Sequence, residues 1–192
     1  MARYILSGLI LTAIIPLWGL LMYLIKQVVF RTIGALAGGR MAAMLVNWLT
    51  IPGVVHHELS HALFALITGA KITEMKLFYP DPQDGSLGHV NFAARGNFLL
   101  RAIQYTFVAS APVIMGTVTC VGTFLLLKGV ELSTGWLILI GYLLFSILIH
   151  ASMSGADVRI MFKGIWVMCV VAMIVCAVFQ VDLISLLPAI GR

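Results

Sequence analysis

Two histidines and a glutamate lie close together in an apolar stretch of the sequence, in the order His57-Glu58-Leu59-Ser60-His61. Residues four apart share one face of an α-helix, so His57 and His61 can direct two imidazoles at one metal ion. Ionisable side chains are costly in an apolar environment, where they are usually paired, metal-bound or functional. The pattern therefore predicts a zinc site with hydrolytic chemistry, in which His57 and His61 are ligands and Glu58 is the general base.

A third ligand has to come from elsewhere in the chain, because a catalytic zinc normally takes three protein ligands and keeps its fourth position open. We expect Asp157, since residues 152–155 can end one helix and Asp157 can project from the start of the next. Two other roles stay open for Asp157, a first-turn carboxylate favoured by the helix dipole and a partner of Arg159. His150 is the leading alternative ligand, and His89 follows it.

Other polar side chains near the motif are weaker candidates. His56 points away from the face that carries the two ligand histidines, so we expect it to pack or to hydrogen-bond. Carboxylates in the polar segment that follows are explained by solvation alone; they are Glu74, Asp81 and Asp84. Three cysteines lie in apolar runs without metal-binding spacing and predict small buried side chains; they are Cys120, Cys169 and Cys176.

Composition places the chain in a lipid bilayer. The 192 residues are 61% hydrophobic and only 10% charged, and the mean hydropathy is +1.08. This composition is far more apolar than that of a soluble domain, whose surface contacts water. We expect one membrane-embedded domain over residues 1–192, with its core at about 41–163. The net charge of +5 comes from basic residues in the loops, which indicates a positive-inside bias and not a nucleic-acid partner.

Apolar runs predict an all-α polytopic membrane protein with about five transmembrane helices. They are residues 4–25, 41–68, 97–127, 135–150 and 160–181. We expect Pro52 and Gly53 to kink the second helix one turn before the histidines, and Pro112 to interrupt the third. Residues 183–190 suit an interfacial tail.

A short β-hairpin-like insertion is expected after the second helix. Residues 70–79 and 86–92 favour strands, and residues 80–85 have turn chemistry. Beside an active site, such a hairpin offers an edge to which an unwound substrate segment can add as another strand. A plain surface connector is the alternative.

Basic residues predict a cytoplasmic N-terminus by a small margin. With this orientation the cytoplasmic side carries seven of them: Arg3, Lys71, Lys76, Arg95, Arg101, Arg159 and Lys163. The other side carries five: Lys26, Arg31, Arg40, Lys128 and Arg192. The positive-inside rule favours the first side as cytoplasmic.

The order of these features resembles the site-2 protease family of intramembrane zinc metalloproteases over residues 41–163. The specific part is His57-Glu58-x-x-His61; the hairpin-like Gly88-His89-Val90 segment, a later proline at Pro112 and the distant Asp157 agree in order and context. The chain departs from the family in two places. Asp157 lies between alanine and valine where the family has Leu-Asp-Gly or Asn-Pro-Asp-Gly, and the asparagine of the family's Gly-Pro-x-x-Asn element is missing. The substrate-holding role of that asparagine would pass to Asn91 or Asn97, or be absent.

The resemblance implies peptide-bond hydrolysis in transmembrane protein substrates. Zinc would polarise a water and the scissile carbonyl, and Glu58 would carry the proton to the leaving amine. A metal-ion or proton transporter could use the same intramembrane cluster, and a scaffold with a structural zinc is a third class. No paired repeat of the kind common in transporters is evident, which favours the protease. Substrate identity and oligomeric state do not follow from the sequence.

Overall fold

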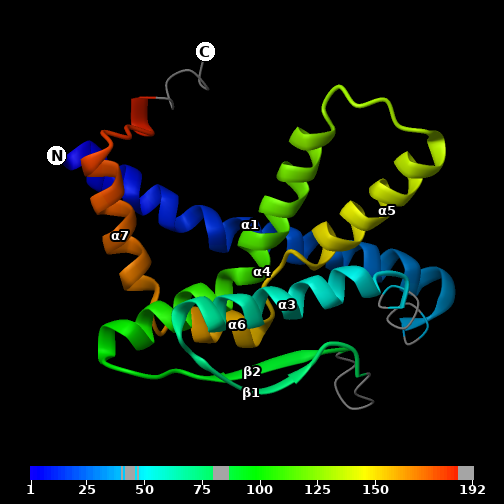
Figure 1. The fold of residues 1–192 in the computed structure, drawn as a ribbon, viewed down its shortest axis with the longest axis horizontal. Helices are drawn as coiled ribbons and strands as arrows, with labels where there is room; N and C mark the ends of the chain where they lie inside the picture. The colour runs from blue at the N-terminus through cyan, green and yellow to red at the C-terminus, as the bar shows by residue number, and fades with distance from the viewer. Residues whose placement is uncertain (40, 42–45, 47, 80–86, 186–192) are drawn as a thin grey trace.

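The chain begins with one long helix, α1 (Ala2–Ala37), which is drawn in blue in Figure 1. The structure, a computed structural model, describes residues 1–39, 41, 46, 48–79 and 87–185. The predicted first span, 4–25, lies within α1, and the helix continues because residues 26–37 contain no proline to stop it. It ends at Gly38, whose positive φ of 85° suits glycine.

The helix with the histidine motif, α3 (Ile51–Thr68), begins at the proline that we expected to kink it. Pro52 lies in the first turn, where the missing N–H of proline removes no hydrogen bond. Trp48 and Leu49 just before it are helical and Thr50 is a turn, so the helical path is interrupted at Thr50, close to the expected kink. Gly69 ends α3 in the left-handed conformation, with φ 75°.

The predicted hairpin is present beside α3. Strand β1 (Lys71–Lys76) pairs antiparallel with β2 (His89–Ala93), with a register shift between Ile72 and Glu74. The predicted turn at 80–85 lies outside the described residues, as does part of the predicted tail at 183–190.

The third predicted span is a single helix, α4 (Phe98–Leu127). Asn97 caps it, since the Asn97 side chain accepts a hydrogen bond from the amide of Leu100 at 2.9 Å. The helix continues through Pro112, so the predicted interruption is wrong. Neighbouring helices can compensate for the backbone bond that a proline removes within a membrane.

The fourth predicted span matches α5 (Thr134–His150), whereas the fifth is divided. Its start lies in the short helix α6 (Gly155–Met161), and the rest forms α7 (Ile165–Val178) after a turn. Helices α5 and α6 form a bent pair with an angle of 60° between them. The expected break at residues 152–155 is therefore confirmed, and it separates α5 from α6.

Fewer helices than the predicted five are long and apolar enough to cross a membrane. Within the described residues these are α1 and α4, with a third if α5 and α6 count as one bent span. Helix α3 is not among them, because three histidines and a glutamate lower its hydropathy. The structure thus confirms a mostly helical fold with helices able to span a membrane and a small hairpin, and the count of five spans stays a prediction.

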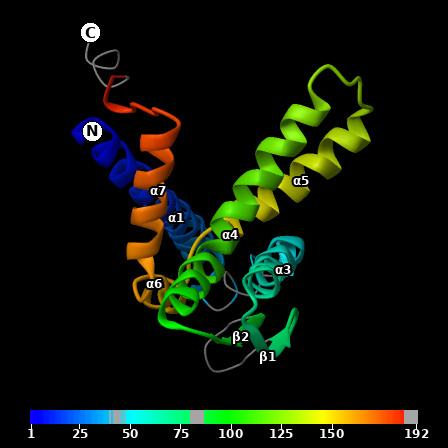
Figure 2. The same cartoon turned by 60° about the vertical axis from the view of Figure 1, so that its left-hand side comes forward.

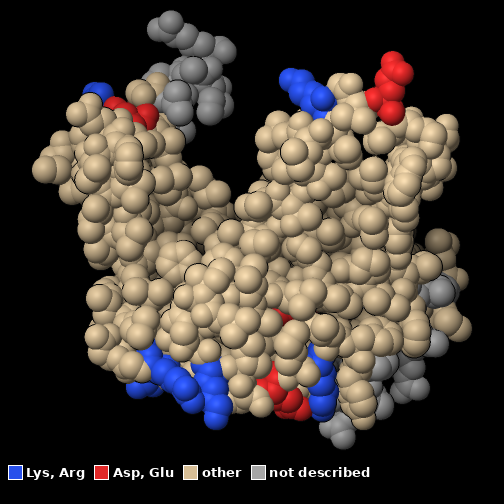
Figure 3. All heavy atoms as spheres, viewed as in Figure 1, with Lys and Arg blue, Asp and Glu red and all other residues tan. Residues whose placement is uncertain are grey.

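The helices form two arms above a base (Figures 1 and 2). The later part of α4 and α5 make one arm, and α7 with the start of α1 makes the other; the first part of α4, α3, α6 and the hairpin lie in the base. Figure 3 shows a notch between the arms, and charged side chains gather along the upper and lower edges of this face with a mostly uncharged band between them. This distribution is typical of a protein whose middle lies in hydrocarbon.

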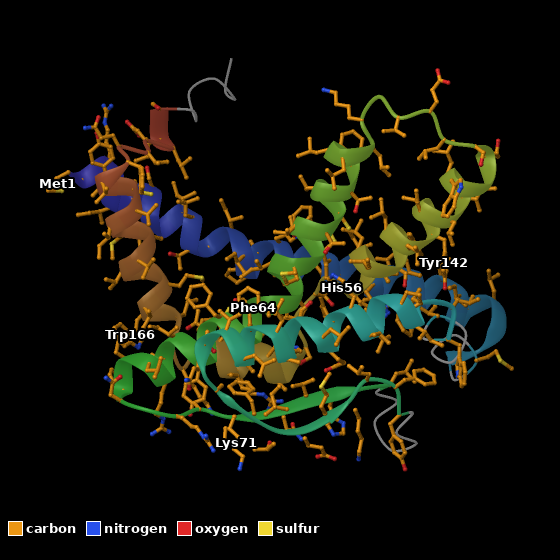
Figure 4. All side chains as sticks on the ribbon, in the orientation of Figure 1. Met1, His56, Phe64, Lys71, Tyr142 and Trp166 are labelled. Atoms are coloured by element: carbon orange, nitrogen blue, oxygen red, sulfur yellow. The ribbon has the colours of Figure 1, made fainter. Side chains whose placement is uncertain are left out.

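The N-terminus and the hairpin, which the charge count places on one side of the membrane, lie apart in the structure. In Figure 4 Met1 lies high in the view and Lys71 lies at the lower edge. The charge count groups Arg3 with Lys71 on one side, which requires two complete crossings before the hairpin. Because α3 lies across the base, the structure separates the N-terminus from the hairpin. The membrane side on which the N-terminus lies stays a prediction.

Close helix packing positions the base. A Cβ atom added at Gly53 would overlap the backbone carbonyl of Ser146, so α3 and α5 approach each other as closely as glycine allows. Gly53 also donates its amide hydrogen to the Ser146 hydroxyl at 2.8 Å. On the other side of the base, Met161 of α6 is fully buried against α4. These contacts hold α5 and α6 on either side of the histidine motif.

Candidate metal centre

Three potential ligand atoms converge where α3 meets the start of α6. The Nε2 atoms of His57 and His61 are 3.2 Å apart, and the Nε2 atom of His61 is 3.4 Å from Oδ1 of Asp157. One ligand atom from each residue lies within 4.8 Å of the others. The structure thus brings together the three residues that the sequence predicts as metal ligands.

Each histidine is oriented by a backbone carbonyl. Nδ1 of His57 donates to the carbonyl of His150 at 2.8 Å, and Nδ1 of His61 donates to the carbonyl of Val108 at 2.7 Å. A carbonyl can only accept a hydrogen bond, so each Nδ1 carries a proton. The lone pair of each neutral ring is then on Nε2, which faces the cluster.

The cluster fits a metal ion. Two Nε2 lone pairs and a carboxylate oxygen are hydrogen-bond acceptors that face one another, and a cation between them would stabilise this arrangement. Tetrahedral zinc with bonds of about 2.0–2.2 Å to nitrogen and oxygen places neighbouring ligand atoms about 3.3 Å apart. The two separations of 3.2 Å and 3.4 Å agree with this value. The donor set of two imidazoles and one carboxylate also suits zinc.

Asp157 divides its two carboxylate oxygens between two tasks. Oδ2 accepts hydrogen bonds from the amide of Ser154 at 2.8 Å and from its hydroxyl at 2.6 Å. The Ser154 hydroxyl in turn accepts from the Asp157 amide, which completes a capping box at the start of α6. The other oxygen, Oδ1, faces His61. The first-turn role and the ligand role are therefore compatible in one side chain.

Glu58 is buried beside the cluster and contacts the hairpin. The backbone amide of Val90 on β2 donates a hydrogen bond to its carboxylate. A Cβ atom added at Gly88 would lie 3.0 Å from Cγ of Glu58, so the chain before β2 packs directly on this side chain. The hairpin therefore contacts the Glu58 side chain directly, and this contact fixes the hairpin next to the cluster.

His150 lies next to the cluster but its ring is engaged elsewhere. Its Nε2 lies 2.7 Å from the hydroxyl of Thr50, and its Nδ1 lies 3.5 Å from Nζ of Lys26. The Thr50 hydroxyl donates to the carbonyl of Val46, so it accepts from His150. Both ring nitrogens have partners, and the residue contributes its carbonyl to His57. The geometry favours Asp157 over His150 as third ligand.

The remaining candidates lie away from the cluster. His89 lies 3.3 Å from Glu74 on the exposed hairpin. Lys76 and then His89 hold the pKa of the Glu74 carboxyl below its usual range. His56 lies on the side of α3 that faces α4 (Figure 4), where its Nε2 is 3.0 Å from the hydroxyl of Thr119.

The two asparagines proposed as substitutes for the missing family residue have local partners. Asn91 donates to the Glu74 carboxylate at 3.3 Å, and Asn97 caps α4. Ser60 donates to the carbonyl of His56 within α3 at 2.6 Å. The three cysteines are free; Cys176 is buried as expected, whereas Cys120 and Cys169 are only partly buried.

Sequence reasoning missed the groups that orient the ligands. Ser154 could have been found, because a serine three residues before an aspartate is the pattern of a capping box. The carbonyls of Val108 and His150 have no sequence signal, since every residue has a carbonyl. Lys26 and Thr50 come near His150 only through helix packing.

The chain matches no protein-family profile, no curated protein and no solved structure. The resemblance of the sequence to site-2 proteases therefore stays a prediction.

Proposed function

We propose that the protein is an intramembrane zinc metalloprotease. The observation that carries this proposal is the convergence of Nε2 of His57, Nε2 of His61 and Oδ1 of Asp157 beside the buried carboxylate of Glu58. Three ligands leave one coordination position for substrate or water, which separates a catalytic zinc site from a structural one. A carboxylate that is not a ligand then supplies the base.

The residues around the ion have separate tasks in this mechanism. Zinc, when bound, would supply a Lewis acid that polarises the scissile carbonyl and lowers the pKa of water. Glu58 takes the proton from the attacking water and delivers it to the leaving amine. The hydrogen bond from Val90 occupies part of the Glu58 carboxylate and holds it near Asp157. Ser154 keeps Oδ2 of Asp157 away from the substrate.

The hairpin supports a way to present the substrate. The Val90 amide is directed at Glu58, so the outer edge of β2 faces α3 and the cluster. A transmembrane substrate has to unwind before cleavage, because a helix uses its own backbone groups. An unwound segment that adds to the outer edge of β2 would lie next to Glu58, and its main chain would be held without a demand for one sequence.

The experiment that tests the proposal is Glu58→Gln. This variant keeps the size of the side chain and removes the base, so zinc content should stay at about one per chain while cleavage falls by two or more orders of magnitude. Wild type and variant are each co-expressed with a library of tagged single-span membrane proteins, and shortened fragments are sought. Leu59→Gln, at an exposed position next in the sequence, is the matched control and should still cleave.

One contact favours a second function, transport of protons or metal ions. The 3.2 Å separation of the two Nε2 atoms can also hold a shared proton instead of a metal ion. Flux of zinc or protons across reconstituted vesicles measures this directly. If flux depends on Glu58 and the formation of substrate fragments does not, the protease proposal fails and the transporter proposal replaces it.

A further inference from the structure

We propose that Arg101, Tyr105 and Lys163 form a binding site for the phosphate of an anionic membrane phospholipid, with Phe98 and Trp166 as its apolar floor. The site lies where α4 begins and where the chain turns from α6 into α7. It is separate from the metal centre and does not rest on the proposed protease function.

Two cations share one tyrosine in this site. Nη2 of Arg101 donates to the Tyr105 hydroxyl at 3.3 Å, and Nζ of Lys163 lies 5.5 Å from the centre of the Tyr105 ring. Arg101 and Lys163 are exposed, and within the described part of the chain neither forms an ion pair with a carboxylate. Two positive charges held near each other without a negative partner favour an anion between them.

The start of α4 adds to the positive potential. The first turn of this 30-residue helix contains Arg101 and no acidic residue. A helix N-terminus carries a partial positive charge, so a basic residue there is unfavourable unless an anion binds. The Arg101 guanidinium offers a planar fork of donors to phosphate oxygens, and the Lys163 ammonium adds a point charge.

The level of the site in the membrane identifies the source of the phosphate. Phe98 is the first residue of a helix that is long and apolar enough to span a bilayer. Its ring stacks on Trp166 with 5.4 Å between ring centres, and 75% of Phe98 is exposed. Figure 4 shows Trp166 toward the lower left, and Figure 3 shows basic side chains at the lower left edge of the same view. Exposed aromatic rings beneath basic side chains are typical of the headgroup level, so we assign the phosphate to a phospholipid.

The experiment compares lipid retention by native mass spectrometry. The full chain is purified with equal amounts of phosphatidylglycerol and phosphatidylcholine that have the same acyl chains. Wild type should retain phosphatidylglycerol preferentially. A basic residue near the surface contributes about fivefold to anionic lipid binding, so the double variant Arg101→Gln with Lys163→Gln should lose about 25-fold. Equal retention of the two lipids by wild type, or no loss in the double variant, would overturn the proposal.

A matched control and a competitor complete the test. Lys128→Gln removes an exposed basic residue at the other end of α4 and should leave retention unchanged. Glycerol phosphate, added at constant ionic strength, should not displace the lipid; displacement at equal concentration would assign the site to free phosphate. If the double variant does not fold, Tyr105→Phe removes the hydroxyl that accepts from Arg101, and its retention should fall severalfold, or the proposal fails.

Discussion

Histidine and carboxylate meet in two regions of this protein, at the metal centre and on the hairpin, with different results. On the hairpin, His89 and Lys76 both contact the exposed carboxylate of Glu74, which therefore has positively charged or hydrogen-bonding partners. At the metal centre, His61 contacts Asp157, but Nδ1 of His61 is already committed to the carbonyl of Val108. The same residue types pair with each other in one region and present acceptor atoms to one another in the other.

The difference shows that residue type does not decide whether a group of side chains binds metal. The deciding factor is which partners the other polar atoms of these side chains have. The carbonyls of Val108 and His150 accept hydrogen bonds from the Nδ1 atoms and leave the Nε2 lone pairs facing the cluster, where His61 and Asp157 are buried and His57 is partly buried. On the hairpin, water is close to every group and no metal ion is needed.

The largest expected effect separates the two regions by metal content. Asp157→Ala removes one of three proposed ligands, so zinc should be lost from a site that we expect to hold about one ion per chain. His89→Ala removes the equivalent residue on the hairpin and should leave zinc unchanged. Elemental analysis of the purified variants is the measurement. His150→Ala should keep zinc; zinc that persists in Asp157→Ala and disappears in His150→Ala would show that the ligand assignment is wrong.

A second prediction separates the ligands from the packing that aims them. Gly53→Ala places a methyl group against the carbonyl of Ser146, so α3 and α5 have to move apart, and we expect a loss of about 1–3 kcal/mol in the free energy of unfolding. The same movement pulls His57 away from the carbonyl of His150 and should weaken zinc binding by roughly 10–100-fold. Gly122→Ala is the matched control, because nothing lies within 4 Å of a Cβ atom there. Thermal unfolding and zinc titration measure both effects, and equal behaviour of the two variants would remove the packing argument.

A third prediction concerns the contact between the two regions. Val90→Pro removes the amide that hydrogen-bonds Glu58 and disturbs the edge of β2, so cleavage should fall by about tenfold or more while zinc content stays intact. Val90→Ala keeps the amide and should cleave almost normally. Leu77→Pro, just beyond β1, disturbs the strand pairing without touching Glu58. Full activity in both proline variants would reduce the hairpin to a connector.

The smallest effect is expected on the hairpin itself. The lowered pKa of the Glu74 carboxyl means that its ion pairs stabilise the folded state above its usual pKa of about 4.3, and this contribution is lost as the pH falls through the lowered value. Because the pair is exposed, Glu74→Gln should change the unfolding midpoint by less than about 1 °C at pH 7 and leave zinc unchanged. Loss of zinc in the Glu74→Gln variant would show that the hairpin carboxylate also takes part in metal binding, which would contradict the difference drawn between the hairpin and the candidate metal centre.

The fold was predictable where one physical signal dominates. The apolar run before Leu127 and the strand-forming residues on either side of a turn predict α4 and the hairpin, and both are present. The prolines gave a weaker signal. Pro52 lies in the first turn of α3 just after a break at Thr50, whereas α4 continues through Pro112, because the effect of a proline depends on which backbone groups its neighbours can supply. The count of five spans stays a prediction, because within the described residues only α1, α4 and the bent pair of α5 and α6 are long and apolar enough to cross a membrane.

The sequence by itself determined that His57 and His61 share a helix face, since their spacing equals about one helical turn, and that Glu58 lies beside them. It could rank Asp157 above His150 only from a predicted helix start. Tertiary structure brought Asp157 to the histidines across about a hundred residues of chain, and it chose the carbonyls that set the ring tautomers. Local spacing is set by backbone geometry, whereas long-range contacts depend on how closely helices pack, and glycines such as Gly53 permit that packing here.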